Sequence, residues 1–291
     1  MNLTDKIFHD DEAARIHLEA QRWPDGAYCP HCGECEAVTL LQGKSTKPGT
    51  YICKSCRTKF TVTVGTIFER SHIGLAKWML AFRLMASAKK GVSAHQLHRT
   101  LGVTYKTAWF MAHRIREAMR LDAPEPMGGP GKVIEADETY VGGKVTNKHA
   151  SKRLSAALEA DLKQKVVTLV ERDGAARSFH VANVTSKTLR TVIVTNASRK
   201  SHLMTDGHTA YRSIGREFDA HSAVNHDAGE YVREGHHHSN TVENYFSILK
   251  RGIVGTFHHV SERTSRAIWT SSISATPTAQ AWACRTRCAP T

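Results

Sequence analysis

The chain contains 291 residues, of which 41% are hydrophobic and 23% charged, and it carries a formal net charge of +13. It is long enough for two domains, and its composition is typical of a globular protein. No run approaches the roughly 18 apolar residues of a membrane span, and the N-terminus has no signal-peptide pattern. These properties exclude a membrane or secreted protein, so we expect a cytoplasmic one.

Four of the seven cysteines have the spacing of a metal site. Cys29 and Cys32 lie in "YCPHCGEC", and Cys53 and Cys56 lie in "YICKSC", with 20 residues between the pairs. Two C-x2-C turns can each direct two sulfurs at one tetrahedral ion, so this spacing predicts a structural Zn²⁺ site in a zinc ribbon. Cys35 is left out of the site because its use in place of Cys32 would spoil the spacing.

Helical patterns and a strong positive charge follow the cysteines. Residues 69–120 contain ten Lys or Arg against two Glu, a net of +8. Such a segment attracts polyanions, of which nucleic acid is the commonest, although a solvated helical face is the alternative. A first helix is predicted to end at Gly91, with one apolar face formed by Leu75, Trp78, Met79 and Phe82.

The next two predicted helices match the outline of a helix-turn-helix. Ser93 and Gln96 form a capping box for a short helix, Gly102 lies in a turn, and Thr104 can cap a longer basic helix. In such a motif the N-terminal residues of the second helix contact base edges and basic side chains contact phosphates. The DNA-contacting residues we expect are Tyr105, Lys106, Thr107 and Arg114. A plain helical hairpin is the alternative.

Acidic residues interrupt the first strand pattern after a Pro/Gly-rich segment at 121–132. The stretch "VIEADETYVGGKV", residues 133–145, is typical of a buried strand, yet it contains Glu135, Asp137 and Glu138. Two strands around a turn at Asp173-Gly174 follow. A mixed segment at 186–197, which can be a helix, a strand that ends at Asp206 and a helix from Ser239 or Asn240 to Gly252 come next.

This order of elements is that of an RNase H-like core, so we expect an α/β (α+β) protein with a mixed sheet. Such a core carries one carboxylate on its first strand, one just past its fourth strand and one on a later helix. Asp137, Asp206 and Glu243 occupy those three places. Each has a simpler interpretation: Asp206 before Gly207 can be a turn residue, and Asn240 with Glu243 can be a capping box.

Several motifs in the expected order carry a resemblance to a known family. They are the four cysteines, "GTIFERSHIGLAKWM", "DETYVGGK", "TDGHTAY" and "HSNTVENYFSILKRGIVGTFHHVSE". With these motifs, residues 20–262 resemble the IS1595-type insertion-sequence transposases that contain an ISXO2-like DDE domain.

The resemblance implies a bacterial, nucleoid-associated enzyme that binds transposon ends, cuts and joins DNA strands, and acts as a homo-oligomer. It implies two Mg²⁺ or Mn²⁺ ions, with Asp137 as the shared ligand and Asp206 and Glu243 each completing one site. It also implies a fourth signature residue, Lys250, which is seven residues after Glu243. The family has either Asn or Glu at the third position, so Asn240 is the alternative to Glu243.

The C-terminal segment "RTSRAIWTSSISATPTAQAWACRTRCAPT" has no helical or strand period and departs from the family pattern. We expect a frameshift near residue 263, because the codons of Ser271–Thr276 can encode a more typical segment in another frame. A catalytically impaired remnant and a DNA-binding regulator are therefore the alternatives to an active transposase. The expected segments are a helical leader (1–20), a zinc ribbon (21–65), a helix-turn-helix region (66–120), a linker (121–132), an RNase H-like domain (133–262) and an atypical tail (263–291).

Overall fold

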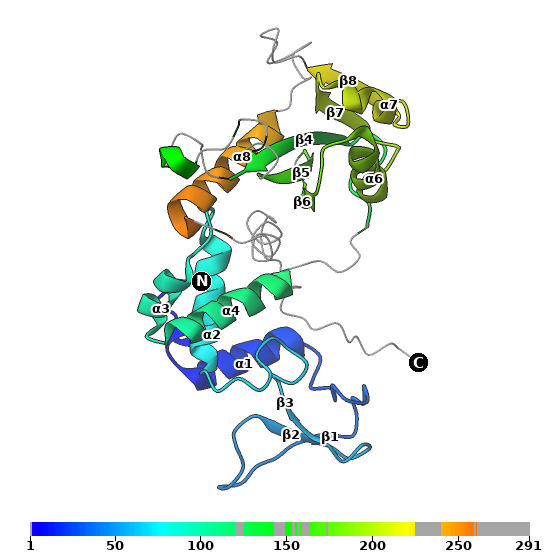
Figure 1. Ribbon diagram of the computed structural model, residues 1–291. Helices are drawn as coiled ribbons and strands as arrows, with labels where there is room; N and C mark the ends of the chain where they lie inside the picture. The colour runs from blue at the N-terminus through cyan, green and yellow to red at the C-terminus, as the bar shows by residue number, and fades with distance from the viewer. Residues whose placement is uncertain are drawn as a thin grey trace. The chain divides into compact units, whose positions relative to one another are not determined.

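The computed structural model of the chain describes residues 2–119, 125–142, 149–152, 155, 158, 163–172, 174–224, 240–258 and 260 (Figure 1). The described residues form two compact units. Unit 1 contains residues 2–88 and 92–119, and unit 2 contains residues 89–91 and those from 125 onward. The expected C-terminal tail, including the proposed frameshift, lies outside the described residues, as does Asp173 of the expected turn.

Unit 1 contains a three-stranded antiparallel sheet and four α-helices. The strands follow each other in the order β1-β2-β3. Its elements are η1 (Lys6–Phe8), α1 (Asp11–Arg22), β1 (Val38–Leu40), β2 (Thr50–Cys53), β3 (Lys59–Thr61), α2 (Leu75–Ser87), α3 (Ala94–Leu101) and α4 (Tyr105–Met119).

A single hydrophobic core runs through the expected leader, zinc ribbon and helical region of unit 1, whose expected boundaries lie at residues 20 and 65. Trp23, just after α1, packs edge-to-face against Tyr51 and Phe60 of the ribbon. The buried guanidinium of Arg22 donates to the carbonyl oxygens of Val62 and Val64 at 2.6 Å each. Leader, ribbon and helices therefore share a single core.

The N-terminus of α2 receives its cap from α1. The Asp11 Oδ1 atom accepts a hydrogen bond from the Ala76 amide at 2.8 Å, which satisfies an amide that has no partner within the helix. A Cβ at Gly74 would lie 2.5 Å from Asp11, so this approach requires a glycine. The helix ends at Ser87, four residues before the expected stop at Gly91; Gly91 instead has a φ of +77° in the loop that follows.

The capping signals of the expected helix-turn-helix region are confirmed as local structure. Ser93 Oγ accepts from the Gln96 amide, and Thr104 Oγ1 accepts from the Thr107 amide, both at 3.2 Å. Gly102 ends α3 with a φ of 60°, a conformation that glycine adopts without strain. The inward face of α4 is formed by four buried residues, Ala108, Met111, Ala112 and Ile115, and by the partly buried Met119.

Unit 2 is built on a five-stranded mixed sheet of order β6-β5-β4-β7-β8 (Figure 1). The three strands β4, β5 and β6 form an antiparallel meander, and β7 and β8 continue the sheet in parallel with β4. The elements are β4 (Val133–Val141), η3 (Ala150–Lys152), β5 (Gln164–Glu171), β6 (Ala176–Val181), α6 (Ser186–Asn196), β7 (His202–Asp206), η4 (Thr209–Tyr211), α7 (Arg212–Gly215), β8 (Ala220–Val224), α8 (Asn240–Gly252) and the π-helical η6 (Ile253–Phe257).

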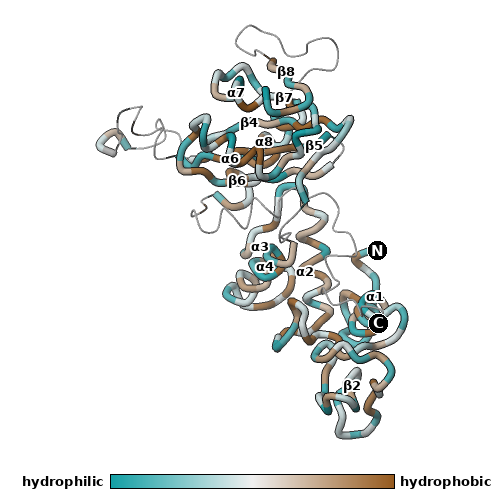
Figure 2. Tube along the Cα trace, turned by 90° about the vertical axis from the view of Figure 1, so that its right-hand side faces the viewer, coloured by the Kyte–Doolittle hydropathy of each residue, from teal (hydrophilic) through white to brown (hydrophobic). Residues whose placement is uncertain are grey.

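Helices cover both faces of this sheet. Leu189 and Ile193 of α6 pack on one face, together with Tyr211 and Ile214. Val242, Tyr245, Phe246 and Leu249 of α8 pack on the other face. The hydrophobic stretches of the central strands and of α8 lie in this interior (Figure 2). The expected mixed-sheet core is thus confirmed, with α6 as the helix that the sequence had left open.

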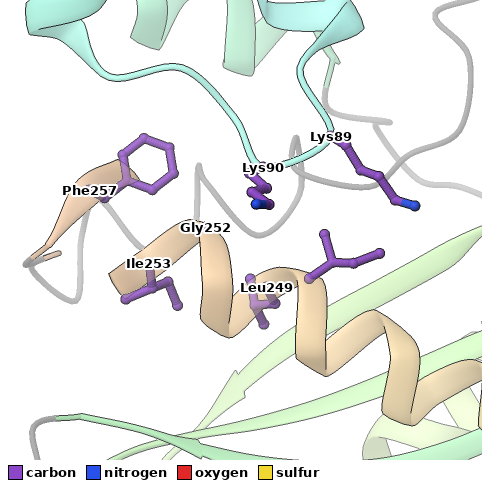
Figure 3. A pocket seen from close by; sticks show the side chains of 7 residues that line it. Lys89, Lys90, Leu249, Gly252, Ile253 and Phe257 are labelled. Carbon is purple, nitrogen blue, oxygen red and sulfur yellow. The ribbon is translucent and has the colours of Figure 1, made fainter. Parts of the chain in front are cut away.

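Close backbone approaches fix both ends of the described part of unit 2. Residues 125–132, expected as a linker, are held against unit 2, where the Gly128 amide donates to Glu171 and a Cβ at Gly128 would lie 2.2 Å from the Ser201 hydroxyl. At the other end, the Lys90 carbonyl oxygen lies so close to α8 that a Cβ at Gly252 would be 2.8 Å away (Figure 3).

Candidate functional site

The four predicted cysteines converge in the ribbon. Their Sγ atoms all lie within 4.8 Å of one another, with 3.6 Å between Cys29 and Cys56 and 3.6 Å between Cys32 and Cys53. Tetrahedral Zn–S bonds of about 2.3 Å place sulfurs about 3.8 Å apart, so this set fits Zn²⁺. Hydrogen bonds from Thr58 lower the pKa of Cys56 to about 6. A Glu34 hydrogen bond lowers the pKa of Cys32, but burial and the other three thiols raise it to about 12, so metal binding has to displace protons from this group.

Matching turns shape the two halves of the cysteine site. The residue after the second cysteine of each pair has a positive φ: 82° at Gly33 and 59° at Arg57. Glu34 connects the halves, because its carboxylate accepts from the Glu36 amide at 3.0 Å and from the Ser55 hydroxyl at 3.1 Å. Sequence spacing identified the sulfurs but not Glu34, whose partner Ser55 is 21 residues away.

The register of strand β4 explains why acidic residues occur within a buried strand. Asp137 pairs with Thr168 of β5 in the antiparallel ladder. In the parallel ladder Ala136 pairs with Thr205 of β7, so Asp206, one residue further on, lies beside Asp137 on the neighbouring strand. Successive side chains alternate between faces, so Glu135 and Asp137 share the face covered by α8. Glu138 points to the opposite face.

The surroundings of Asp137 strongly oppose its negative charge. Burial raises the pKa of Asp137 to about 7, and the charges of Glu138, Asp206 and Glu243 act in the same direction. All three acids expected from the sequence therefore lie close enough to interact. Such a group of mutually repelling carboxylates is typical of a site for a hard divalent cation.

The three carboxylates do not surround a single point. Among the described residues, only the four cysteines form a set of three or more possible ligand atoms within 4.8 Å of one another. Asp206 also has the local role we weighed for it, because its Oδ1 atom accepts from the His208 amide at 3.1 Å. The acids thus form an open arrangement along β4, β7 and the start of α8.

The opposite face of β4 carries a second polar contact. Tyr211 is fully buried and donates its hydroxyl hydrogen to the Glu138 carboxylate. Burial raises the pKa of Glu138, the Tyr211 hydroxyl lowers it, and the charge of Asp206 raises it again. The carboxylates of Asp206 and Glu138 therefore interact from neighbouring strands. The sequence had assigned no partner to Glu138 and no role to Tyr211.

Helix α8 presents the remaining candidate residues. It begins at Asn240, the alternative third residue, and Glu243 follows in its first turn. Asn240, Glu243 and Lys250 are all exposed. Lys250 is seven residues after Glu243, which places it on nearly the same side of the helix. Glu243 is thus near enough for its charge to raise the pKa of Asp137, and Lys250 is exposed two turns further along α8.

The outer surface of α4 carries the residues expected to contact DNA. Tyr105 and Lys106 are exposed and Thr107 is half-buried. Trp109 and Phe110, which the sequence analysis did not select, are 48% and 49% exposed on the same helix. The half-buried Arg114 donates to the Glu69 carbonyl at 3.1 Å and lies over the Phe110 ring. In this arrangement part of its guanidinium is engaged within unit 1.

Comparisons with known proteins identify the family of the chain. Residues 128–267 match the model of the ISXO2-like transposase domain, and residues 9–59 match that of the transposase zinc-ribbon domain. A Halobacterium salinarum protein, described as an uncharacterized protein in transposable element ISH50, is 32% identical over 258 residues, which cover 84% of each chain. The chain belongs to the IS1595 transposase family. The ISXO2-like match contains β4, β7 and α8, and with them the three acids.

A solved structure gives a more distant match to this transposase. It is a chain in the structure of the simian T-cell lymphotropic virus intasome in complex with PP2A regulatory subunit B56 gamma. The two are 16% identical, with a TM-score of 0.29, and the match covers 67% of the transposase and 65% of the other chain. A likeness at this level supports no conclusion. In the part of the transposase that the structure describes, no helix is both long and apolar enough to cross a membrane.

Proposed function

We propose that this transposase binds the ends of its insertion sequence and catalyses metal-dependent cleavage and joining of DNA strands. The observation that carries the proposal is the position of Asp206 beside Asp137 on neighbouring parallel strands, with Glu243 near enough to raise the pKa of Asp137. The three carboxylates come from separate parts of the chain, on β4, at the end of β7 and in the first turn of α8. Burial and the neighbouring charges both oppose ionisation of Asp137, and a bound cation would offset this cost.

Divalent cations fit this set of donors. Asp137, Asp206 and Glu243 would hold the ions, with Asp137 as the ligand expected to be shared, because Mg²⁺ or Mn²⁺ prefers carboxylate oxygens. When bound, such ions activate the attacking oxygen and stabilise the leaving one. The protein holds the three carboxylates on β4, β7 and α8. The exposed Lys250 is placed to contact a phosphate oxygen.

The proposed DNA-binding function belongs to unit 1. Its zinc-stabilised core presents the N-terminal end of α4, where Tyr105 and Lys106 are exposed. An α-helix fits the major groove, and its N-terminal side chains reach base edges. Because joining an element to a target requires both ends, we propose that at least two copies of the chain act together.

Strand transfer on labelled DNA containing the sequences that flank the gene tests this proposal. With Mg²⁺ or Mn²⁺, the unaltered protein should produce cut and joined strands. Asp137→Asn, Asp206→Asn and Glu243→Gln should each abolish these products and leave DNA binding unchanged. Asp219→Asn, at an exposed acid of unit 2, is the matched control and should retain activity.

The same assay separates the alternatives. A protein that binds the flanking DNA tightly and never cuts it would be a regulator or an impaired remnant, and the proposed reaction would then be wrong. Asn240→Ala compared with Glu243→Gln identifies the third residue. We expect the first variant to remain active and the second to be inactive, because a carboxylate binds Mg²⁺ better than an amide does.

A further inference from the structure

Glu135 is a buried carboxylate outside the set of three acids. It is 0% exposed, in the middle of β4, two residues before Asp137. A buried charge is costly unless it is paired and hydrogen-bonded. Arg172 provides the pairing, with 2.7 Å between its Nε atom and Glu135 Oε1. One ion pair alone would account for a structural role.

The other partners of Glu135 belong to the first turn of α8. Its Oε2 atom accepts from the Thr241 amide at 2.9 Å and from the Val242 amide at 3.0 Å. Its Oε1 atom accepts from the Thr241 hydroxyl at 3.0 Å. Amides in the first turn have no acceptor within their helix, and a negative charge there is favoured by the helix dipole. Glu135 therefore caps α8 from a strand that lies 106 residues earlier in the chain.

This cap joins the two elements that carry the candidate metal ligands Asp137 and Glu243. Val242 precedes Glu243, and Glu135 shares a strand face with Asp137, about 7 Å along the strand. The carboxylate of Glu135 thus connects the backbone that carries Glu243 to the backbone that carries Asp137. A change in the length or charge of this side chain would move one ligand relative to the other.

A second connection holds α8 on the other side of Glu243. The Tyr245 hydroxyl bonds to Ser178 Oγ at 2.6 Å, and Ser178 Oγ bonds to Thr168 Oγ1 at 2.8 Å. Thr168 is the partner of Asp137 in the ladder between β4 and β5. Glu243 is therefore flanked by two polar connections, at residues 241–242 and at residue 245, that both lead to the sheet beside Asp137.

We propose that Glu135 is a positioning residue, which sets the distance between Glu243 and Asp137 and so prepares the site for divalent cations. The inference rests on the proposed function. Glu135 itself is paired with Arg172 and the α8 amides, so it acts through Glu243 and does not contact the ions. Removing a group that orients a metal ligand typically costs roughly 10- to 100-fold in metal affinity.

Mn²⁺ titration of the full-length, zinc-loaded protein, followed by the paramagnetic resonance of free Mn²⁺, tests the inference. In Glu135→Gln the amide group can accept fewer hydrogen bonds and has no charge. We expect its Mn²⁺ affinity to fall roughly 10- to 100-fold. Hydrogen exchange at the Thr241 and Val242 amides should become faster, while DNA binding stays unchanged.

Asp11→Asn provides the matched control, because Asp11 also caps a helix from a distant element but lies in unit 1. We expect it to leave Mn²⁺ affinity unchanged. If Glu135→Gln binds Mn²⁺ as tightly as the unaltered protein, or if both variants lose affinity alike, the positioning role is wrong.

If the Glu135→Gln protein does not fold, Thr241→Val provides a second test. It removes only the hydroxyl bond to Glu135 and keeps both backbone bonds, so we expect a smaller loss of Mn²⁺ affinity, of several-fold. Unchanged affinity in Thr241→Val would contradict the inference. A failure of the proposed function gives a different result. The unaltered protein would then not bind Mn²⁺ at the three acids, so Asp137→Asn would not reduce its Mn²⁺ binding.

Discussion

Tyr211 donates its hydroxyl hydrogen to Glu138, the residue next to Asp137, across 73 residues of sequence. The contact lies on the face of β4 opposite α8. It stabilises the ionised form of Glu138, which burial and the charge of Asp206 disfavour. The candidate site is therefore supported from both faces of its central strand. On one face Glu135 accepts hydrogen bonds from α8, and on the other Glu138 accepts one from Tyr211 of η4.

We predict that Tyr211→Phe lowers the free energy of unfolding by about 1–3 kcal/mol at pH 8, because the Glu138 carboxylate loses a donor. The pKa of Glu138 is already raised, and it should rise further without this donor. The loss should be smaller at pH 5, where more of Glu138 is protonated. Urea denaturation at both pH values measures the effect. Tyr140→Phe, at an exposed tyrosine of β4, should be neutral, and a larger loss at pH 5 would contradict the account.

The raised pKa of Asp137 predicts a pH-dependent stability of the metal-free protein. The pKa of about 7 in the folded chain exceeds the ordinary value of 3.8, so between these values the folded state binds more protons than the unfolded state. The stabilisation is full below about pH 4 and is lost as the pH rises through 7. At pH 8 the ionised carboxylate should cost on the order of a few kcal/mol.

Asp137→Asn removes this charge and should raise the thermal midpoint of the metal-free protein at pH 8 more than at pH 5. Scanning calorimetry at the two pH values measures the difference, with Asp219→Asn as the control. An equal midpoint for Asp137→Asn and the unaltered protein at pH 8 would show that burial and the neighbouring charges do not disfavour the ionised Asp137.

Zinc content provides a direct test of the ribbon. Cys53→Ser should lose most of the bound Zn²⁺ and destabilise unit 1, because Cys53 lies at 0% exposure in the same core as Phe60 and Trp78. Cys35→Ser should keep one Zn²⁺ per chain. Metal analysis by atomic emission measures the zinc content of both variants. Zinc loss in Cys35→Ser but not in Cys53→Ser would show that the four sulfurs are wrongly assigned.

The exposed Lys106 provides a test of DNA binding. If it contacts a phosphate, Lys106→Ala should weaken binding and reduce the slope of log K against log salt by about 0.9. Fluorescence anisotropy at several salt concentrations gives this slope. Lys6→Ala removes an equal charge at an exposed position outside α4 and should leave the slope unchanged. Equal effects of the two changes would indicate a nonspecific charge contribution.

Local signals in the sequence predicted what depends on neighbours in the chain. The sequence predicted the cysteine cluster and the Ser93 and Thr104 caps, because each depends on a short motif. It also predicted which elements carry the three acids, because this depends on the order of elements. Strand β8 was not predicted, since "AHSAV" alternates weakly and is a strand through its pairing with β7. Its length and composition alone do not distinguish it from a loop.

Partners that are distant in sequence could not be predicted. Strand alternation places Glu135 on the same face as Asp137, but its partners in α8 and Arg172 follow only from the packed sheet. The same is true of Asp11 at the start of α2 and of Tyr211 at Glu138. In each case a buried or capping carboxylate finds its donors through tertiary structure, for which a single sequence carries no local pattern.

The central claim is that Asp137, Asp206 and Glu243 together hold divalent cations. The most direct measurement is a crystal structure of the full chain grown with Mn²⁺, with the ions located by anomalous scattering. The account predicts two Mn²⁺ peaks that share Asp137, one of them bound also by Asp206 and the other by Glu243. Peaks elsewhere, or none at these carboxylates when Mn²⁺ is saturating, would contradict it.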